Sequence, residues 1–546
     1  MVGGTGAFGS RLVRGLVSHS DFAVMIAARD LARAQALAAE LGAGERVGAV
    51  SLDAASVDQA ALRATGAWAV VDAAGPFQGG DLRLARAAIA AGLHYVDLAD
   101  ARDAVAAISQ LDDAARAAGL VVLGGASSTP ALSHAVLDEI THGWRAIDRI
   151  EVAIAPGNRA PRGLSVVQSI LSYAGRPVRL FLDGVWQERP GWGLTGRREL
   201  PGLGRRWLSL CETPDLDLLP ERFRVRRTAI FRAGLELPVL HLGLLVASLP
   251  LRLLPRLSLA PLARPIRVLA DLFAPFGTDR GGMLVQAEGR DVGGAPVRAT
   301  WSLVAEAGDG PVIPTLPALA ALRLLDRGAL AVGARSAAGA LPLAAIAAEF
   351  APFRIATRVD VRALVTGGVF AATLGAGFAR LPAPVRAVHG DDAWLALSGE
   401  AQVEGAASWP ARLVAMLFGF PPATPRTPVR VTLAGENGRE TWIRQFGRHR
   451  FRSVLSSGHA PGEVVERFGP FAFTLRLAAT PEAMTYEVTA WRILGLPLPR
   501  CLMPWSQARE AVDDAGRFTF DVQIALPLLG RLVRYRGWLV PETPAG

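Results

Sequence analysis

Three glycines near the start of the chain have the spacing of a phosphate-binding turn. The first nine residues read MVGGTGAFG, so Gly4, Gly6 and Gly9 form a Gly-x-Gly-x-x-Gly pattern. In this pattern the first glycine makes a tight turn, the second lets backbone approach a pyrophosphate, and the third lets the next helix pack closely. The N-terminus of that helix offers N–H groups and a positive dipole end. We therefore predict a dinucleotide site made by Gly4, Thr5, Gly6, Ala7, Phe8 and Gly9.

Arg29 and Asp53 are the residues that we expect at the adenosine end of this dinucleotide. An NAD site usually has Asp or Glu at the tip of the next strand, bonding the ribose 2′-hydroxyl. Here the tip is Ala28, and Arg29 follows it. A guanidinium suits a 2′-phosphate and can stack on adenine, so the sequence favours NADP over NAD. In the alternative, Arg29 is a solvated loop charge and Asp30 caps the next helix.

Two further segments follow strands that we expect in the same sheet. Ala74, Gly75 and Pro76 come at the carboxyl end of one strand, where they would shape backbone beside the nicotinamide ribose. Tyr95 and Asp97 alternate onto one face of the next strand, so a tyrosine hydroxyl beside a carboxylate could donate a proton to a reduced substrate. The structural alternative packs Tyr95 under helices and binds Asp97 to loop amides.

Several kinds of chemistry are excluded by composition. All 58 basic residues are arginine, which rules out Schiff bases, a P-loop lysine and a Tyr-x-x-x-Lys pair. Cys211 and Cys501 lie far apart, and no Cys, His or acidic cluster has metal-ligand spacing, so we predict no metal site. His241 is expected to be packed, and we find no partner for His389 or His459. The net charge is +9, but no basic helix interleaved with aromatics indicates nucleic-acid binding.

The elements that would position these residues alternate along the first 145 residues. We expect strands at 23–28, 46–52, 67–73, 94–98 and 120–123, and helices at 11–17, 31–41 and 82–91. This alternation is typical of a doubly wound parallel sheet, so residues 1–145 are predicted to form a Rossmann domain. Only MVG precedes the glycine turn, whereas strands usually have about 5–6 residues. We therefore expect the natural chain to begin a few residues earlier.

Four motifs in this region resemble the NADP-binding domain of saccharopine-dehydrogenase-like oxidoreductases. They are GGTGAFGSRLVRGL, AARDLARAQALA, DAAGPFQGGD and GLHYVDLADAR, and the resemblance continues through GASSTPALSHAVLDE to about residue 350. It implies a Rossmann domain followed by an α+β substrate domain, at 146–350, that closes over the nicotinamide end. Members of the family include saccharopine enzymes and lipid-linked enoyl reductases. The short first strand and the lack of lysine depart from the family, and the carboxylate clamps of saccharopine chemistry are not found.

The middle region contains an apolar run bordered by arginines. Residues 221–267 hold nine arginines and two acids, and they flank the uncharged run 237–251. Spanning a membrane takes about 20 apolar residues, so this run is too short, and Pro238 and Pro250 break it further. It either lies in a membrane interface or forms a buried core or dimer-interface helix whose arginines face water. Elsewhere in this region we expect strands at 149–155 and 178–186, a helix at 166–173, and a hairpin of 283–288 with 297–305.

The remaining residues are predicted to form a helical linker, 351–374, and a β-rich domain, 375–546. We expect a helix at 411–418 and strands at 394–402, 429–433, 441–445, 451–455, 471–477, 484–491, 518–525 and 532–539. Many strands with short turns favour a curved antiparallel sheet or partial barrel. FARLPAPVRAVHG and LVRYRGWL resemble a bacterial domain of unknown function that is appended to saccharopine-dehydrogenase-like chains. A curved sheet can enclose an apolar ligand, which leads to a lipid-binding hypothesis.

The sequence thus predicts an NADP-dependent oxidoreductase acting on a C=C or C=N bond of a hydrophobic or lipid-linked substrate. The alternative is a non-catalytic NADP(H)-binding and lipid-binding protein at a membrane surface. A third interpretation is a saccharopine enzyme of lysine metabolism. The given sequence opens without a signal-peptide pattern, so we expect a cytoplasmic location, with peripheral contact at the inner face of the cytoplasmic membrane. A homodimer is left open.

Overall fold

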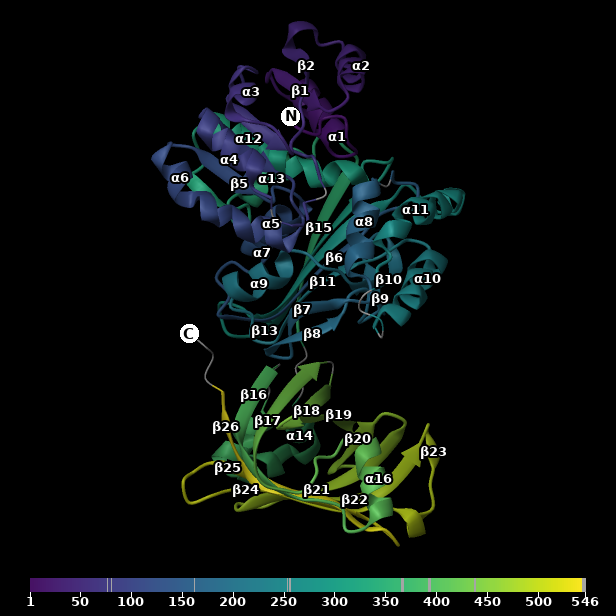
Figure 1. The fold of residues 1–546 in the computed structure, drawn as a ribbon. Coiled ribbons are helices and arrows are strands. Elements are labelled where there is room, and N and C mark those ends of the chain that lie inside the picture. The colour runs from purple at the N-terminus through teal and green to yellow at the C-terminus, as the bar shows by residue number, and fades with distance from the viewer. Residues whose placement is uncertain are drawn as a thin grey trace. The chain divides into compact units, whose positions relative to one another are not determined.

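The computed structural model describes residues 1–75, 77–79, 81–161, 163–252, 254, 257–364, 368–390, 394–436 and 438–542. The chain divides into two compact units (Figure 1). The first comprises Met1–Gly294 and Arg298–Arg362, and the second comprises Ala295–Val297 and Ala363–Gly546. The division at Arg362 falls inside the predicted linker 351–374, while the predicted boundary at residue 145 lies within the first unit.

A parallel sheet forms the N-terminal part of the first unit. Its strands are β1 (Val24–Ala28), β2 (Val47–Ser51), β3 (Ala69–Asp72), β4 (His94–Asp97), β5 (Val121–Gly124) and β14 (Gly333–Ser336). β1 pairs with β2, and the other four have the order β14-β5-β4-β3. Val2 bridges Ala27 on one side and Asp72 on the other, so the first residues act as the central strand. The order is that of a doubly wound sheet, which confirms the predicted Rossmann fold.

Helices connect and cover these strands because their apolar residues recur along one side. They are α1 (Gly9–His19), α2 (Leu31–Leu41), α3 (Gln59–Arg63), α4 (Arg83–Ala91), α5 (Arg102–Ala107), α6 (Asp112–Ala117), α7 (Ser133–Ile140), α12 (Leu316–Asp326) and α13 (Leu343–Ala348). In α1, Leu12, Val13 and Leu16 are buried in the core beneath the sheet. α12 packs against α1, so a late segment of the chain completes the nucleotide-binding half.

A mixed sheet forms the rest of the first unit. Its strands are β6 (Ala146–Ala155), β7 (Pro177–Leu182), β8 (Val185–Pro190), β9 (Gly196–Leu200), β10 (Gly204–Leu210), β11 (Thr228–Ala233), β12 (Gly281–Arg290), β13 (Pro296–Ala305) and β15 (Ile355–Ala363). The main order is β15-β13-β12-β6-β11-β10-β9. The adjacent β12 and β13 confirm the predicted hairpin. The helices of this part are α8 (Leu164–Tyr173), α9 (Asp215–Arg222), α10 (Pro238–Ser248) and α11 (Ala263–Leu272).

Two predictions about this half were wrong. The segment 178–186, predicted as one strand, is the β7–β8 hairpin with its turn at Asp183 and Gly184. Both turn residues have positive φ, 56° and 74°, as the tight turn of a two-residue hairpin requires. The linker 351–374, predicted as helical, contains the strand β15, whose sequence IATRVDVRA alternates β-branched residues with others. That alternation favours a strand over a helix.

The second unit is a closed antiparallel barrel of ten strands. They are β16 (Trp394–Glu404), β17 (Thr424–Glu436), β18 (Arg439–Phe446), β19 (His449–Ser457), β20 (Glu463–Phe468), β21 (Phe471–Ala479), β22 (Ala483–Ile493), β24 (Trp505–Val512), β25 (Phe518–Leu526) and β26 (Gly530–Pro541). The pairing of β21 with both β20 and β22 closes the ring, and the short β23 (Leu496–Pro497) extends β22. The β-rich antiparallel prediction is confirmed, and the curvature is complete rather than partial.

Three helices accompany the barrel. α14 (Val369–Leu374) and α15 (Ala383–Val388) precede β16, whereas α16 (Trp409–Leu417) connects the end of β16 to the start of β17. Because β16 runs from one end of the barrel to the other, α15 and α16 belong to opposite ends. A separate core gathers inside the barrel, distinct from the cores of the first unit.

Candidate functional site

The glycine turn is closed by contacts that leave no room for larger residues. The amide of Gly6 donates to the carbonyl oxygen of Gly3 at 2.9 Å. A Cβ atom at Gly9, the first residue of α1, would overlap that same carbonyl group. The helix therefore begins directly on the turn, with its N-terminal N–H groups at the place predicted for the pyrophosphate. Thr5, Ala7 and Phe8 complete this turn.

The turn adjoins the end of β3, as the sequence analysis expects. Gly3 has φ of +70°, and a Cβ atom there would lie 2.7 Å from both the carbonyl carbon of Ala73 and the amide nitrogen of Ala74. The strand order reverses between Val2 and β3, which makes this edge the switch point of the sheet. Gly75 follows in the chain and is half-buried, whereas Pro76 lies outside the described residues.

Arg29 lies at the carboxyl end of β1, where we predict the adenosine half of the cofactor. It directly follows β1, is exposed, and makes no hydrogen bond or ion pair with any described residue. Asp30 caps α2 by accepting from the amide of Arg33 at 3.1 Å, as the structural alternative proposes. Asp53 follows β2, the parallel neighbour of β1, and accepts from the amide of Ala55. An unpaired guanidinium beside the glycine turn fits a cofactor with a 2′-phosphate.

Tyr95 and Asp97 lie two positions apart on β4, and both are buried. The hydroxyl of Tyr95 donates to Asp72 of β3 at 3.2 Å, and its side chain is buried among apolar residues. Asp97 accepts from the amides of Ala99 and Gly125. Burial, followed by the Asp72 carboxylate, raises the pKa of Asp97 to about 7, although its amide partners oppose the shift. These contacts match the structural alternative, and the catalytic role stays a prediction.

The mixed domain reaches the nucleotide-binding edge through α8. A Cβ atom at Gly163, just before α8, would contact the side chain of Ala7 at 3.4 Å. Further along, Gln78 donates to the hydroxyl of Ser169 at 2.9 Å. Since Gln78 belongs to the connection after β3, α8 covers the turn at the side where we predict the nicotinamide.

Polar side chains that the sequence analysis missed lie at the same junction. The hydroxyl of Tyr173, the last residue of α8, donates to the sulfur of Cys211 at 2.9 Å. Burial raises the pKa of the Cys211 thiol to about 12, and Asp100, which follows β4, contributes to that shift together with Glu212. The thiol is therefore protonated at neutral pH. The hydroxyl group in this cluster is that of Tyr173. Residues from three segments far apart in sequence meet here, so no local motif could indicate them.

A second buried group also escaped the sequence analysis. His134 of α7 faces the carboxylate of Asp215 at 3.5 Å, and both side chains are fully buried. Their polar atoms, and the hydroxyls of Thr129 and Thr213, have no hydrogen-bond partner among the described residues. Buried polar groups of this kind are commonly satisfied by internal water. His134 stands within the quoted motif GASSTPALSHAVLDE, but nothing in its spacing distinguishes it.

His241 and His389 are both buried, but only the environment of His241 was predicted. His241 is packed, as expected: its Nε2 lies 2.9 Å from the Ser209 hydroxyl, and burial lowers its pKa to about 4. His389, for which the sequence suggested no partner, contacts Glu510 at 2.5 Å inside the barrel. No cluster of metal-ligating residues occurs in the part of the chain that the structure describes.

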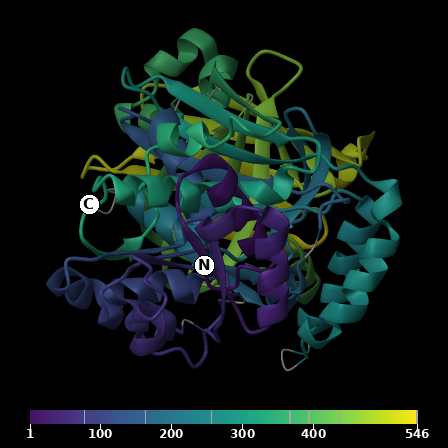
Figure 2. The ribbon, with the colours of Figure 1, turned by 90° about the horizontal axis from the view of Figure 1, so that it is seen from above.

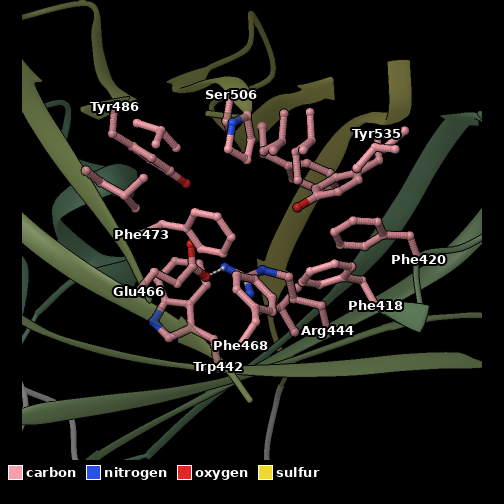
Figure 3. A pocket seen from close by; sticks show the side chains of 18 of the residues that line it. Phe418, Phe420, Trp442, Arg444, Glu466, Phe468, Phe473, Tyr486, Ser506 and Tyr535 are labelled. Carbon is pink, nitrogen blue, oxygen red and sulfur yellow. Dashed lines mark hydrogen bonds and ion pairs between the residues drawn. The ribbon is translucent and has the colours of Figure 1, made fainter. Parts of the chain in front are cut away.

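The barrel encloses a cavity of about 380 Å³ (Figure 3). Most of its lining is apolar and aromatic, and the labelled members include Phe418, Phe420, Phe468, Phe473 and Trp442. The inward positions of the strands alternate with outward ones, as in other barrels. A cavity of this size falls within the range of about 300–1,000 Å³ that small-molecule sites occupy.

A few polar side chains project into this cavity. Arg444 lies 3.2 Å from Glu466 and donates to the hydroxyl of Ser453 at 2.8 Å. The hydroxyl of Tyr486 donates to Glu510 at 2.9 Å. Figure 3 shows the hydroxyls of Tyr486 and Tyr535 directed into the space between the aromatic rings. The cavity thus combines an apolar wall with a small number of hydrogen-bonding groups.

The helices that contain and follow the apolar run expose large side chains. α10 and α11 lie at the periphery of the first unit in both ribbon views (Figures 1 and 2). The exposed residues are Val239, Val246, Leu249, Leu254, Leu257, Leu262, Val268, Leu269, Leu272 and Phe276, here called the α10–α11 face. Among the described residues, no helix has both the length and the apolar character needed to cross a membrane.

The parallel sheet, the glycine turn at its switch point and the adjoining mixed domain define an NAD(P)-binding fold of the oxidoreductase type. The comparisons agree with this class. Residues 1–123 match the saccharopine dehydrogenase NADP binding domain, and residues 381–539 match a domain of unknown function, DUF4166. The chain therefore joins a saccharopine-dehydrogenase-like NADP-binding domain to a domain of that second family. No curated protein matches the sequence.

Several solved structures are similar over parts of the chain. Apo saccharopine dehydrogenase (L-Glu forming) from Saccharomyces cerevisiae is 15% identical, with a TM-score of 0.47 over 66% of this chain and 99% of its own. A probable dehydrogenase from Thermotoga maritima is 10% identical, with a TM-score of 0.33 over 64% and 93%. GenD2 from gentamicin A biosynthesis, in complex with NAD, is 17% identical, with a TM-score of 0.25 over 43% and 64%. Similarities at this level define neither substrate nor reaction.

Proposed function

We propose that the protein is an NADP-dependent oxidoreductase that reduces a C=C or C=N bond of a hydrophobic or lipid-linked substrate. The observation that carries the proposal is the position of α8. This helix covers the glycine turn at Ala7 and packs against α11, which bears the α10–α11 face. A substrate drawn from an apolar phase would therefore meet the nicotinamide end of the cofactor beside α8.

The cofactor, when bound, supplies the hydride, and the chain binds and orients it. The Gly3–Gly9 turn and the start of α1 would hold the pyrophosphate. Arg29 would bind the 2′-phosphate, which favours NADP over NAD. Ala74 and Gly75 would border the nicotinamide ribose. Tyr173 and the predicted pair Tyr95 and Asp97 are hydroxyl and carboxyl groups that could deliver a proton.

Contact with a membrane surface is a second part of the proposal. Large apolar side chains of the α10–α11 face stand in solvent, with Leu272 71% and Phe276 74% exposed. Arg252 and Arg264 are exposed among them. An apolar face bordered by arginines can insert into an interface while the guanidinium groups bind anionic headgroups. The inner face of the cytoplasmic membrane offers such headgroups.

A second candidate function is non-catalytic binding of NADP(H) and lipid. The observation that favours it is the burial of Tyr95 and Asp97, whose polar atoms are used by neighbouring strands and loops. The apolar cavity in the barrel would then hold the lipid. The discriminating property is whether bound NADPH is ever consumed.

The first experiment is a fluorescence titration of the purified full chain with NADPH and with NADH. We expect NADPH to bind about tenfold more tightly, a difference of ~1.4 kcal/mol. Equal affinities would contradict the proposed role of Arg29. Oxidation of NADPH is then followed with vesicles of bacterial lipid extract, and separately with saccharopine precursors. Consumption with the lipid extract supports the enzyme, turnover with saccharopine precursors would move the chain into lysine metabolism, and binding without consumption supports the second candidate.

A further inference from the structure

The interior of the barrel changes in character along its axis. Toward the end where α16 joins β16 to β17, the cavity wall consists mainly of phenylalanine rings, namely Phe418, Phe420, Phe468, Phe471 and Phe473. Toward the other end, Phe370 of α14 and Trp442 stack around His389. Arg444, Glu466, Tyr486 and Tyr535 lie between these regions. A ligand in this cavity would therefore have an apolar part near α16 and a polar part deeper inside.

The charges around the polar region are paired with one another. Arg444 and Glu466 form an ion pair whose two side chains are about nine-tenths buried. Glu510 is held by His389 at 2.5 Å and by the Tyr486 hydroxyl at 2.9 Å. Because the arginine already has a carboxylate partner and a second carboxylate stands nearby, an additional buried anion would be repelled.

Tyr535 differs from these residues because its hydroxyl has no partner. Its side chain is 5% exposed, and it makes no hydrogen bond with any described residue. Figure 3 shows the hydroxyl aimed into the cavity. Burial is the main cause that raises the pKa of Tyr535 to about 12, so the group is a neutral donor at physiological pH. Because the hydroxyl faces the cavity, an oxygen atom of a bound ligand could accept its hydrogen bond.

We propose that the barrel binds one neutral, mainly hydrophobic molecule through a single oxygen atom that accepts a hydrogen bond from Tyr535. The oxygen of a ketone, an ester or an alcohol meets this requirement, whereas a carboxylate would face Glu466 and Glu510. An engineered cavity of about 150 Å³ holds benzene, so a cavity of this size accommodates roughly fifteen non-hydrogen atoms. The proposal rests on the lipid-binding role that the second candidate function gives to the barrel, and it specifies the chemistry of the ligand.

The α16 end is the side from which such a molecule would enter. Val414 and Leu417 of α16 line the cavity, while Leu417 is also 80% exposed. Other segments at the same end expose large apolar residues, which are Leu494, Leu496, Leu502, Trp505 and Leu528. A rim of this composition lowers the cost of moving an apolar molecule from lipid or micelle into the barrel.

The test uses the full chain and N-phenyl-1-naphthylamine, a neutral probe whose fluorescence rises in apolar surroundings. We expect the probe to bind, and 2-dodecanone and 1-dodecanol to displace it at least tenfold better than dodecanoate at pH 7.5. Val522→Trp, which fills the cavity, should abolish probe binding while leaving the affinity for NADPH unchanged. An unchanged far-ultraviolet circular dichroism spectrum and an unchanged unfolding transition of the barrel show that the variant is folded.

Two tyrosine variants test the anchoring oxygen. Tyr535→Phe should weaken displacement by 2-dodecanone about tenfold and leave probe affinity within twofold. Tyr486→Phe, the same change where the hydroxyl already serves Glu510, should change the displacement less than threefold. Equal or better displacement by dodecanoate would overturn the neutral-ligand proposal but keep lipid binding. If Tyr535→Phe leaves displacement by 2-dodecanone unchanged, Tyr535 does not anchor the ligand. If the full chain binds NADPH but not the probe, the proposal of lipid binding fails as well.

Discussion

The hydroxyl of Tyr95 donates a hydrogen bond to Asp72, across the neighbouring strands β4 and β3, at 3.2 Å. In the register of these strands Asp72 stands opposite Asp97, so the tyrosine lies close to two buried carboxyl groups. Tyr95 thus contributes to the interior of the sheet rather than to an open cleft. The stability of the nucleotide-binding half should therefore depend on the protonation of the buried carboxyl group of Asp97.

Asp97→Asn tests that dependence on pH. The pKa of Asp97 is about 7 in the folded protein, against 3.8 ordinarily, so the folded state binds the proton more tightly. The stabilisation that protonated Asp97 gives the folded state is fully present below about pH 4 and is lost as pH rises to about 7. The free energy of unfolding falls by no more than ~1.4 kcal/mol per pH unit over this range. We expect denaturant midpoints of the natural protein to fall over this range. The variant should show a weaker dependence, and an unchanged slope would contradict the assignment to Asp97.

Tyr95→Phe separates the structural role from the catalytic one. Loss of the hydrogen bond leaves Asp72 with one partner fewer, so we expect unfolding free energy to drop by about 1–2 kcal/mol. NADPH affinity should stay within twofold, and any turnover rate should stay within threefold. A fall in kcat of a hundredfold or more, with unchanged NADPH affinity, would instead establish Tyr95 as a proton donor. Tyr173→Phe, measured beside it, should reduce turnover more than Tyr95→Phe does.

Gly9→Ala tests the closed glycine turn. The added methyl group would overlap the carbonyl of Gly3, so α1 must move away from the turn. We expect NADPH affinity to fall at least tenfold in a fluorescence titration. Gly15→Ala is the matched control in the same helix, because a Cβ atom there meets only Leu319 at 3.8 Å. That control should keep its affinity and gain about 0.5–1 kcal/mol of stability. Equal NADPH affinity in both variants would contradict the proposed site.

Arg29→Ala tests the choice between NADPH and NADH. Because Arg29 has no partner in the described part of the chain, its removal costs little stability. We expect NADPH affinity to fall about tenfold, or ~1.4 kcal/mol, while NADH affinity changes less than twofold. Arg14→Ala is the control. It removes an exposed guanidinium of α1 that is paired with Glu40 of α2, and it should leave both affinities unchanged. Equal losses for the two cofactors after Arg29→Ala would show that Arg29 does not read the 2′-phosphate.

Local patterns in the sequence were sufficient for the nucleotide-binding half. The helix predicted at 31–41 is α2, and each strand predicted in the parallel sheet is found within two residues of its bounds. These elements carry short-range signals: apolar runs, helix caps and glycine turns.

The strand β24 was missed because its inward positions include Ser506 and Glu510, so the usual alternation of apolar and polar residues is absent. The same polar inward residues are what make the barrel cavity a candidate site.

Contacts between distant segments were beyond the reach of such patterns. Tyr173 meets Cys211 only because α8 and the end of β10 adjoin, and His389 meets Glu510 across 121 positions of the sequence. Likewise, Tyr95 interacts with Asp97 on its own strand, but its hydroxyl also donates to Asp72 of the adjacent strand, a partner that was not predicted. Strand neighbours depend on the global order of the sheet, which the sequence of one strand does not contain.

Membrane contact is tested by Leu272→Glu combined with Phe276→Glu on the α10–α11 face. Burying each apolar side chain in an interface contributes roughly 1.5–3 kcal/mol, so replacing both should lower vesicle affinity at least tenfold. Co-sedimentation with vesicles of phosphatidylglycerol and phosphatidylethanolamine measures this. The double variant Val359→Glu and Val361→Glu, on exposed positions of β15, is the matched control and should bind as the natural protein does. Both variants should retain NADPH affinity, and raised salt should weaken the natural protein's binding because the bordering arginines act electrostatically. Equal sedimentation of the two double variants would contradict membrane contact and would favour the alternative that the α10–α11 face is an interface between protein chains.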